Sequence, residues 1–218
     1  MRFKTHYNIR SYEVDLHGAL KPMQLMQLLQ ESGDRQMREE AVAYDELYNK
    51  EHKAFVVSRM SIIPGKGANF PRGYEMYKGG QLVAKAICNW ALVDTVTGKL
   101  IASKDYDMGT YSMDEAPELS IPRRFRIPKE LKFQEVESSK VAMSMIDINM
   151  HMNNTVYASK LYDNIDDAEK YFITSINLRY VHEAPLGSEF KVYRSDAVDP
   201  GEMDYRAEKL IYFYTEAD

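Results

Sequence analysis

The sequence of 218 residues contains one cysteine, carries no excess of positive charge and has no long apolar run. A single cysteine, Cys88, excludes an internal disulfide and makes a reducing cytoplasm the simplest setting. A formal net charge of −5 argues against nucleic acid as the main partner. We expect neither a signal peptide nor a membrane-spanning segment, because no apolar stretch follows Met1 and none elsewhere is long enough. A content of 44% hydrophobic and 28% charged residues is ordinary for a soluble globular protein.

Several catalytic and cofactor-binding motifs are also absent. No G-x-S-x-G elbow of a serine hydrolase occurs, and no glycine-rich phosphate loop follows a convincing strand. The five histidines show neither H-E-x-x-H nor Cys/His ligand spacing; they are His6, His17, His52, His151 and His182. We therefore expect no metal and no cofactor. Cys88 shares an alternating face with Ala86 and Trp90, which predicts a buried packing thiol rather than a nucleophile.

The most informative segment is the run 147–153, in which polar and apolar residues alternate. Side chains two apart point the same way along an extended backbone, so Asp147, Asn149 and His151 would form one polar row. The opposite row would face a core, and it consists of Ile148, Met150 and Met152. A carboxylate, an amide and an imidazole in one row are suited to activating water. The pattern therefore predicts a catalytic row.

A helix is predicted to begin directly after this row, near Asn154. Its first N–H groups and the positive end of its dipole would then lie beside the polar side chains. The alternative interpretation is an Asx-rich turn that caps the helix. We favour capping for Asn153 and Asn154, and chemistry for the three residues of the row.

The run 147–154, together with Tyr157, closely resembles the D-x-N-x-H-x-N-N-x-x-Y signature of acyl-acyl-carrier-protein (acyl-ACP) thioesterases of bacterial type. Further similarity to this family is spread over most of the chain, in the segments 10–15, 55–60, 90–94 and 179–183. The resemblance implies an α+β fold of two tandem hotdog units, each a long helix wrapped by an antiparallel β-sheet. It also implies hydrolysis of fatty acyl-ACP to free fatty acid and holo-ACP in fatty acid biosynthesis.

The same resemblance assigns residues to the site. It implies catalytic roles for Asp147, Asn149, His151 and Glu183, and substrate binding by Asn153, Asn154 and Tyr157. Water would be the nucleophile, and either Glu183 or His151 the base. Asn149 would orient the water or the carboxylate, and Asp147 would hold the row in place. Plant members of the family have a cysteine directly after the glutamate, but this chain has Ala184 there, which excludes that nucleophile.

An internal repeat relates the two halves of the chain. The segment 13–19 lies 132 residues before 145–151, and in both a strand-like stretch ends in an aspartate and a turn before a helix. The first copy has Asp15, His17 and Ala19 at the positions of the catalytic row, so its imidazole position is an alanine. We expect the second unit to perform the chemistry and the first to support it. As the resemblance implies, the first would also hold the acyl chain.

The proline-interrupted stretch 113–130 is predicted to link an N-terminal hotdog unit, 1–112, to a catalytic C-terminal unit, 131–218. Long helices are predicted at 21–43 and 155–170. β-Structure is predicted at 54–63, 81–103, 172–182 and 189–195, with a hairpin turn at 95–99. A stretch rich in glycine and proline, 63–73, stands where the family has a further strand. We therefore expect either a shortened first sheet or missing residues.

The partner implied by the resemblance is an acyl carrier protein, which is acidic and carries a phosphopantetheine arm. Four basic residues in the linker could dock it: Arg123, Arg124, Arg126 and Lys129. An ordinary solvated linker is the favoured interpretation of this cluster. A homodimer is left open. Two other functions are weighed: a hotdog acyl-CoA thioesterase, disfavoured by the fused double unit, and a non-catalytic acyl-binding hotdog protein, disfavoured by the retained polar row.

Overall fold

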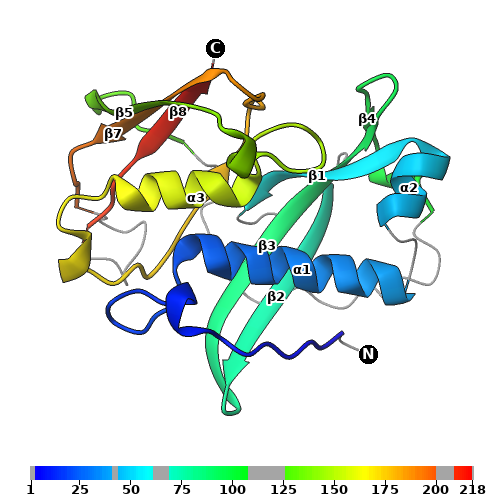
Figure 1. The fold of residues 1–218 in the computed structure, drawn as a ribbon, viewed down its shortest axis with the longest axis horizontal. Coiled ribbons are helices and arrows are strands. Elements are labelled where there is room, and N and C mark those ends of the chain that lie inside the picture. The colour runs from blue at the N-terminus through cyan, green and yellow to red at the C-terminus, as the bar shows by residue number, and fades with distance from the viewer. Residues whose placement is uncertain (1–2, 41–43, 61–68, 108–125, 200–208, 218) are drawn as a thin grey trace. The chain divides into compact units, whose positions relative to one another are not determined.

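The computed structural model describes residues 3–40, 44–60, 69–107, 126–199 and 209–217. These residues form three α-helices and two antiparallel β-sheets (Figure 1). The chain divides into two compact units that interleave along the sequence: one lies within Met1–Asn8, Gln27–Arg123 and Asn177–Arg179, the other within Ile9–Met26, Arg124–Ile176 and Tyr180–Asp218. The predicted division at a linker, 113–130, stays a prediction, and most of that linker lies outside the described residues.

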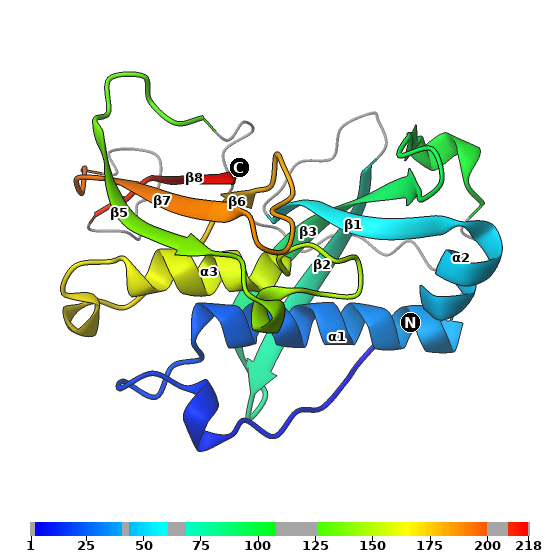
Figure 2. The ribbon, with the colours of Figure 1, turned by 45° about the horizontal axis from the view of Figure 1, so that its top comes forward.

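The first unit holds the larger sheet, with strand order β2-β3-β1-β6 and β4 paired to β3. Its strands are β1 (Lys53–Met60), β2 (Asn69–Lys78), β3 (Gln81–Asp94), β4 (Leu100–Ile101) and β6 (Leu178–Arg179). Helix α1 (Pro22–Glu40) crosses β2 and β3 (Figures 1 and 2). The absence of a side chain at Gly33 brings helix and sheet close, because a Cβ there would lie 2.3 Å from Nη1 of Arg72. A long helix on an antiparallel sheet is the predicted arrangement.

Strand β2 overturns the expectation of a shortened first sheet. It pairs with β3 from Asn69 opposite Ala91 to Lys78 opposite Gln81. Its proline at position 71 is tolerated because β2 is the edge strand among the described residues, where a missing N–H need not cost a ladder hydrogen bond. Gly79 and Gly80 join the two strands with φ of 58° and 82°. Two consecutive positive φ values define the tight hairpin turn that glycine favours.

The predicted hairpin turn at 95–99 is confirmed, because β3 and β4 pair on either side of it. Asp94 holds this turn through its Oδ1, which accepts hydrogen bonds from the backbone N–H groups of Val96 and Thr97. These bonds, with that of the Thr97 hydroxyl, place the pKa of Asp94 below its ordinary value. A short helix, α2 (Tyr44–Glu51), was not predicted.

The second unit holds a three-stranded sheet of order β5-β7-β8. Its strands are β5 (Phe133–Lys140), β7 (Glu189–Ser195) and β8 (Phe213–Ala217), and its helix is α3 (Asn154–Asp163). The helix lies along the sheet in both ribbon views (Figures 1 and 2). The core between them consists of Val141, Met152, Val156, Ala184, Phe190 and Val192. Met23, from the first turn of α1, packs against this same core, so the start of the first long helix belongs to the second unit.

Two predictions for this unit need correction. The helix predicted over 155–170 ends at Asp163, and Asn164 is its C-cap. Arg194 closes that end by donating to the Asn164 carbonyl, at 2.7 Å, and to both carboxylate oxygens of Asp166. A cation at the carboxyl end of a helix is favourable. Of the strand predicted over 172–182, only β6 forms, whereas β7 matches its prediction.

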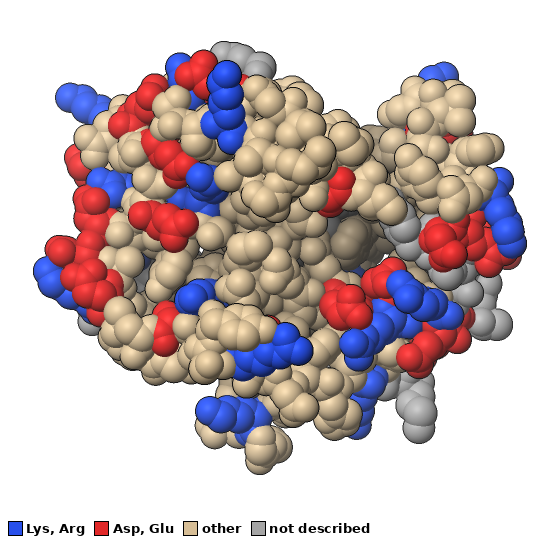
Figure 3. All heavy atoms as spheres, in the orientation of Figure 1, with Lys and Arg blue, Asp and Glu red and all other residues tan. Residues whose placement is uncertain are grey.

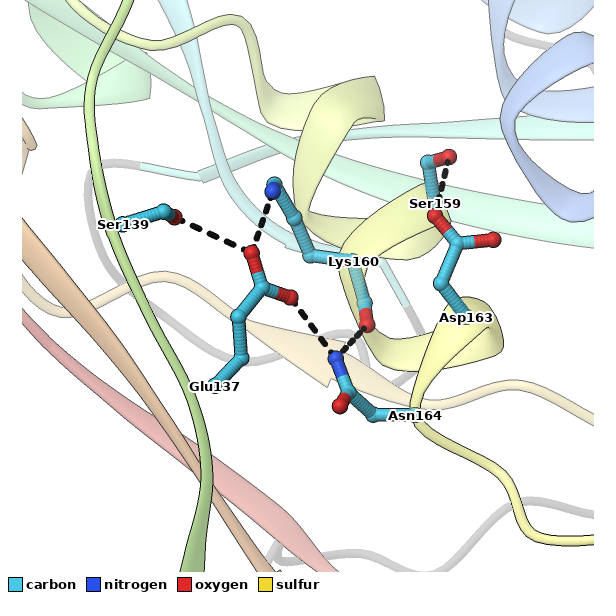
Figure 4. Close-up of polar contacts among 6 residues, drawn as sticks. All are labelled: Glu137, Ser139, Ser159, Lys160, Asp163 and Asn164. Carbon is cyan, nitrogen blue, oxygen red and sulfur yellow. Dashed lines mark hydrogen bonds and ion pairs between the residues drawn. The ribbon is translucent and has the colours of Figure 1, made fainter.

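A polar cluster ties α3 to β5 (Figure 4). Glu137 of β5 accepts hydrogen bonds from Lys160 and Asn164 on the helix side and from Ser139 on its own strand. Burial raises the pKa of Glu137, but these hydrogen bonds outweigh it and the net shift is downward. The cluster therefore stabilises the charged carboxylate, and with it the orientation of α3 on the sheet.

No helix among the described residues has both the length and the apolar character needed to cross a membrane.

Candidate active site

The motif 147–153 does not form an extended row. Asp147 accepts a hydrogen bond on its carbonyl from the N–H of Met150, at 3.0 Å, and donates its own N–H to the carbonyl of His151, also at 3.0 Å. Its Oδ1 accepts from the N–H of Asn149 at 2.8 Å. The backbone therefore reverses direction within four residues, as an aspartate-nucleated turn does. The prediction of one straight polar row is wrong.

The turn also overturns the predicted apolar face. Ile148 is 73% exposed and Met150 is 55% exposed, whereas Met152 is only 4% exposed and reaches the core. Met150 has φ of 65°, in the left-handed region that residues with a side chain rarely adopt. A turn at this point sends the side chains of Ile148 and Met150 to solvent.

The structure brings His151 and Glu183 together. Nδ1 of His151 lies 3.1 Å from Oε2 of Glu183, and their side chains are 35% and 64% exposed. The backbones meet as well: His151 forms an isolated β-bridge with Pro185, and Met152 donates its N–H to the carbonyl of Ala184 at 2.8 Å. The imidazole and carboxylate, 32 positions apart in sequence, thus lie on adjoining backbone segments.

Helix α3 begins directly after this bridge. Asn153 is its N-cap, and its Oδ1 accepts from the N–H of Thr155 at 2.9 Å and from the Thr155 hydroxyl at 2.7 Å. The Asn153 carbonyl accepts from the N–H of Val156. Capping by Asn153 agrees with the favoured interpretation of this residue. Asn153 thereby accepts hydrogen bonds from two backbone N–H groups of the first helical turn, those of Thr155 and Val156. Fewer N–H groups are then left to bind a substrate carbonyl.

Tyr157 is half-buried, and its ring lies edge-on to the rings of Tyr180 and Phe190, at centroid distances of 5.5 Å and 5.6 Å. Burial raises the pKa of its hydroxyl to about 12. A hydrogen bond with the Ala184 backbone opposes this shift, and the carboxylates of Glu183 and Asp147 add to it. The Tyr157 hydroxyl is therefore neutral, and its pKa is affected by both carboxylates of the predicted site.

Sequence reasoning missed Tyr180. Its hydroxyl donates to the carbonyl of Asn154, the first residue of α3, at 2.9 Å. The only signal in the sequence is its position three residues before Glu183.

The first copy of the repeat forms the same turn. Asp15 donates its N–H to the carbonyl of Ala19 at 2.8 Å, and its carbonyl accepts from Gly18 at 3.1 Å. Its Oδ1 accepts from the N–H of His17 at 2.9 Å. The imidazole of this copy faces elsewhere: Nε2 of His17 lies 2.8 Å from the carbonyl oxygen of Glu169.

Two models of known protein families match the chain. The model of the acyl-ACP thioesterase N-terminal domain matches residues 1–70, and that of the C-terminal domain matches residues 129–211. The chain belongs to the acyl-ACP thioesterase family. It is therefore a thioester hydrolase, and its reaction, release of fatty acid from acyl-ACP, belongs to fatty acid biosynthesis.

Solved structures of acyl-ACP thioesterases share the fold at low sequence identity. An acyl-ACP thioesterase from Bacteroides thetaiotaomicron is 18% identical, with a TM-score of 0.71, over 97% of this chain and 96% of that one. The 12:0-ACP thioesterase from Umbellularia californica is 15% identical, with a TM-score of 0.72, over 97% and 92%. An oleoyl thioesterase from Lactobacillus plantarum is 16% identical, with a TM-score of 0.73, over 97% and 89%. The predicted α+β hotdog fold is thus confirmed. No curated protein sequence matches the chain.

The sequence predicted that Cys88 is a buried packing thiol. Cys88 is fully buried, and burial raises the pKa of its thiol to about 12, as a packing thiol requires. The described residues contain no group of three His, Cys, Asp or Glu side chains placed to hold a metal ion. Of the basic linker cluster, Arg123 and Arg124 lie outside the described residues. On the face drawn in Figure 3, acidic and basic side chains around β5, β7 and α3 are interspersed.

Proposed function

We propose that this thioesterase hydrolyses fatty acyl-ACP with a water molecule activated by His151 and Glu183, without a covalent acyl-enzyme. The observation that carries the proposal is the 3.1 Å contact between Nδ1 of His151 and Oε2 of Glu183, beside the N-terminus of α3. A histidine oriented by a carboxylate is a common general base, because the carboxylate fixes the tautomer and stabilises the charged ring.

The contact suggests a division of labour. With Nδ1 directed to Glu183, Nε2 is the nitrogen that takes a proton from water. The water oxygen attacks the thioester carbonyl, and the carbon–sulfur bond breaks as the tetrahedral intermediate collapses. The imidazolium then returns its proton to the departing phosphopantetheine thiolate, so the products are a fatty acid and holo-ACP. Glu183 orients His151 in this scheme and stabilises its charge, whereas the sequence alone left open which of the two is the base.

Asp147 and Asn149 support this pair from the same turn. Asp147 closes the turn through its backbone hydrogen bonds and through the bond that its Oδ1 accepts from Asn149. The closed turn fixes the backbone position of His151. Asn149, two residues before His151, is proposed to orient the attacking water. The positive end of the α3 dipole, together with Asn154 and Tyr157, is proposed to bind the thioester carbonyl; one such donor contributes roughly 10²–10³ in rate. Asn153 is proposed to support substrate binding as the N-cap that fixes the start of α3.

The proposal is tested by hydrolysis of a chain-length series of acyl-ACPs, each matched with the corresponding acyl-CoA, with the released fatty acid identified. We expect acyl-ACP to be the better substrate by kcat/KM. Equal or greater activity on acyl-CoA would favour the acyl-CoA thioesterase. Tight binding of acyl-ACP with no release of fatty acid would favour a non-catalytic acyl-binding protein. Acyl-chain binding by the first unit, a homodimer and a cytoplasmic location stay predictions.

A further inference from the structure

The segment that carries Glu183 is attached to the rest of the site at two places. On its C-terminal side, the Ala184 carbonyl accepts the N–H of Met152 at 2.8 Å, and Pro185 bridges His151. On its N-terminal side, the Tyr180 hydroxyl donates to the carbonyl of Asn154 at 2.9 Å. Glu183 lies between these two attachments.

The residues between the attachments offer little packing of their own. Val181 is 65% exposed and His182 is exposed, so burial does not fix this part of the backbone. Tyr180 is half-buried, and its ring meets that of Tyr157 edge-on at 5.5 Å. Of the three residues before Glu183, Tyr180 thus makes the anchoring contact with α3.

We propose that Tyr180 is a positioning residue for hydrolysis: its hydroxyl holds the Glu183 segment against the start of α3 and thereby sets the Glu183–His151 contact. The inference rests on the proposed roles of these two residues. In this proposal Tyr180 influences the reaction through the position of Glu183.

The hydroxyl is separable from the packing of the ring. Asn154 is the first residue of α3, and its carbonyl belongs to the helical hydrogen-bond ladder. Removing the Tyr180 hydroxyl therefore leaves this acceptor with its place in the ladder, and a phenylalanine ring can keep the contact with Tyr157. Tyr180→Phe should fold normally and loosen the anchoring of Glu183.

The test compares Tyr180→Phe, Glu183→Gln and the double variant with the native protein, by kcat, KM and pH–rate profile on one acyl-ACP. For Tyr180→Phe we expect kcat to fall about tenfold, with KM within about twofold, because the catalytic geometry loosens while substrate contacts remain. The pH–rate profile of Tyr180→Phe should change in the same way as that of Glu183→Gln, because both substitutions weaken the same contact. The double variant should lose no more activity than Glu183→Gln alone.

Tyr171→Phe is the matched control. Tyr171 belongs to the same unit, and its hydroxyl accepts a hydrogen bond from Lys209 at 3.1 Å. It should keep native kcat and the native profile.

Three outcomes separate the proposals. Native kcat and a native profile in Tyr180→Phe would overturn the positioning role. A lower melting temperature with an unchanged pH–rate profile, and a loss of activity additive with that of Glu183→Gln, would also overturn it and show a structural contact only. If Glu183→Gln itself behaves as the native protein, the proposed function of Glu183 fails instead.

Discussion

Two turns of this thioesterase, 132 positions apart, have the same backbone conformation but carry different side chains. The carbonyl of Asp15 accepts from Gly18 as that of Asp147 accepts from Met150. One apolar side chain stands exposed at the same place in each, 71% for Leu16 and 73% for Ile148. Helices α1 and α3 begin at matching positions after the turns. The scaffold is therefore common to both copies and does not by itself make a catalytic site.

The difference lies in three side chains. The position of His151 is Ala19 in the first turn, that of Asn149 is His17, and that of Met150 is a glycine, residue 18. His17 makes a structural contact: its ring packs at a tilt against Phe172, at a centroid distance of 4.5 Å, and its Nε2 is directed to a backbone carbonyl. In the proposed mechanism, catalysis therefore depends on which turn presents an imidazole to a carboxylate.

The largest expected effect distinguishes the two histidines. His151→Ala should lower kcat by ~10³-fold or more with the fold retained, because it removes the proposed base rather than core volume. His17→Ala should stay within about twofold of native kcat. The measurement is steady-state hydrolysis of one acyl-ACP, with circular dichroism as the control for folding. Equal losses in the two variants would break the distinction between the turns.

The carboxylate partner comes next. Glu183→Gln keeps size and hydrogen-bonding capacity but loses the charge, and should cut kcat by ~10²-fold with a much smaller change in KM. Glu169→Gln is the control for the histidine of the first turn, since His17 contacts the backbone carbonyl of Glu169 and not its carboxylate. A native rate across the whole pH range in Glu183→Gln would leave His151 to act alone.

Stability should depend on the cluster that holds the second helix. Glu137→Gln should lower the free energy of unfolding by about 1–3 kcal/mol at neutral pH, because Lys160 loses its charged partner in a largely buried site. The pKa of Glu137 is lowered from 4.5 in the folded state, so its contribution is present above that value and is lost as pH falls through the folded pKa. Urea unfolding at pH 7 and below pH 4 should show the difference between variant and native protein shrinking in acid.

The smallest effect concerns the left-handed position of each turn. Gly18 has φ of 76° and no atom within 4 Å of where a Cβ would lie, so Gly18→Ala tests backbone strain alone and should cost about 1 kcal/mol. Met150→Gly relieves the strain at φ of 65° but adds entropy to the unfolded chain, and should gain about 0.5 kcal/mol. Thermal unfolding measures both. A stabilising Gly18→Ala would contradict the shared geometry.

Local patterns predicted those elements whose signals are local. The β-structure predicted at 189–195 coincides with β7 at both ends, and residues 95–99 form the predicted hairpin turn. The missed strand β2 shows the opposite case. Its proline and glycine suggested a loop, but an edge strand tolerates both, and the Gly79-Gly80 pair was an unused hairpin signal.

The candidate site was only partly predictable. The alternation over 147–153 has the period of a strand, yet Asp147 closes a turn with its own side chain and Met150 adopts a left-handed conformation, and neither shows in a pattern of polar and apolar residues. The approach of Glu183 to His151 depends on a β-bridge between distant segments, so family resemblance, not periodicity, pointed to it. The Tyr180 hydroxyl bonds to a backbone carbonyl, and a contact to the backbone cannot be predicted from a pattern of residue types.

The central claim is that water, activated at the second turn, attacks the thioester directly. It is tested most directly by intact-protein mass spectrometry during a single turnover of acyl-ACP, with the native protein and the slowed Glu183→Gln variant in parallel. Free fatty acid and holo-ACP should appear together, with the mass of the thioesterase unchanged at every time point. An acyl adduct that forms and decays at the rate of turnover, on Cys88 or any other side chain, would contradict the account.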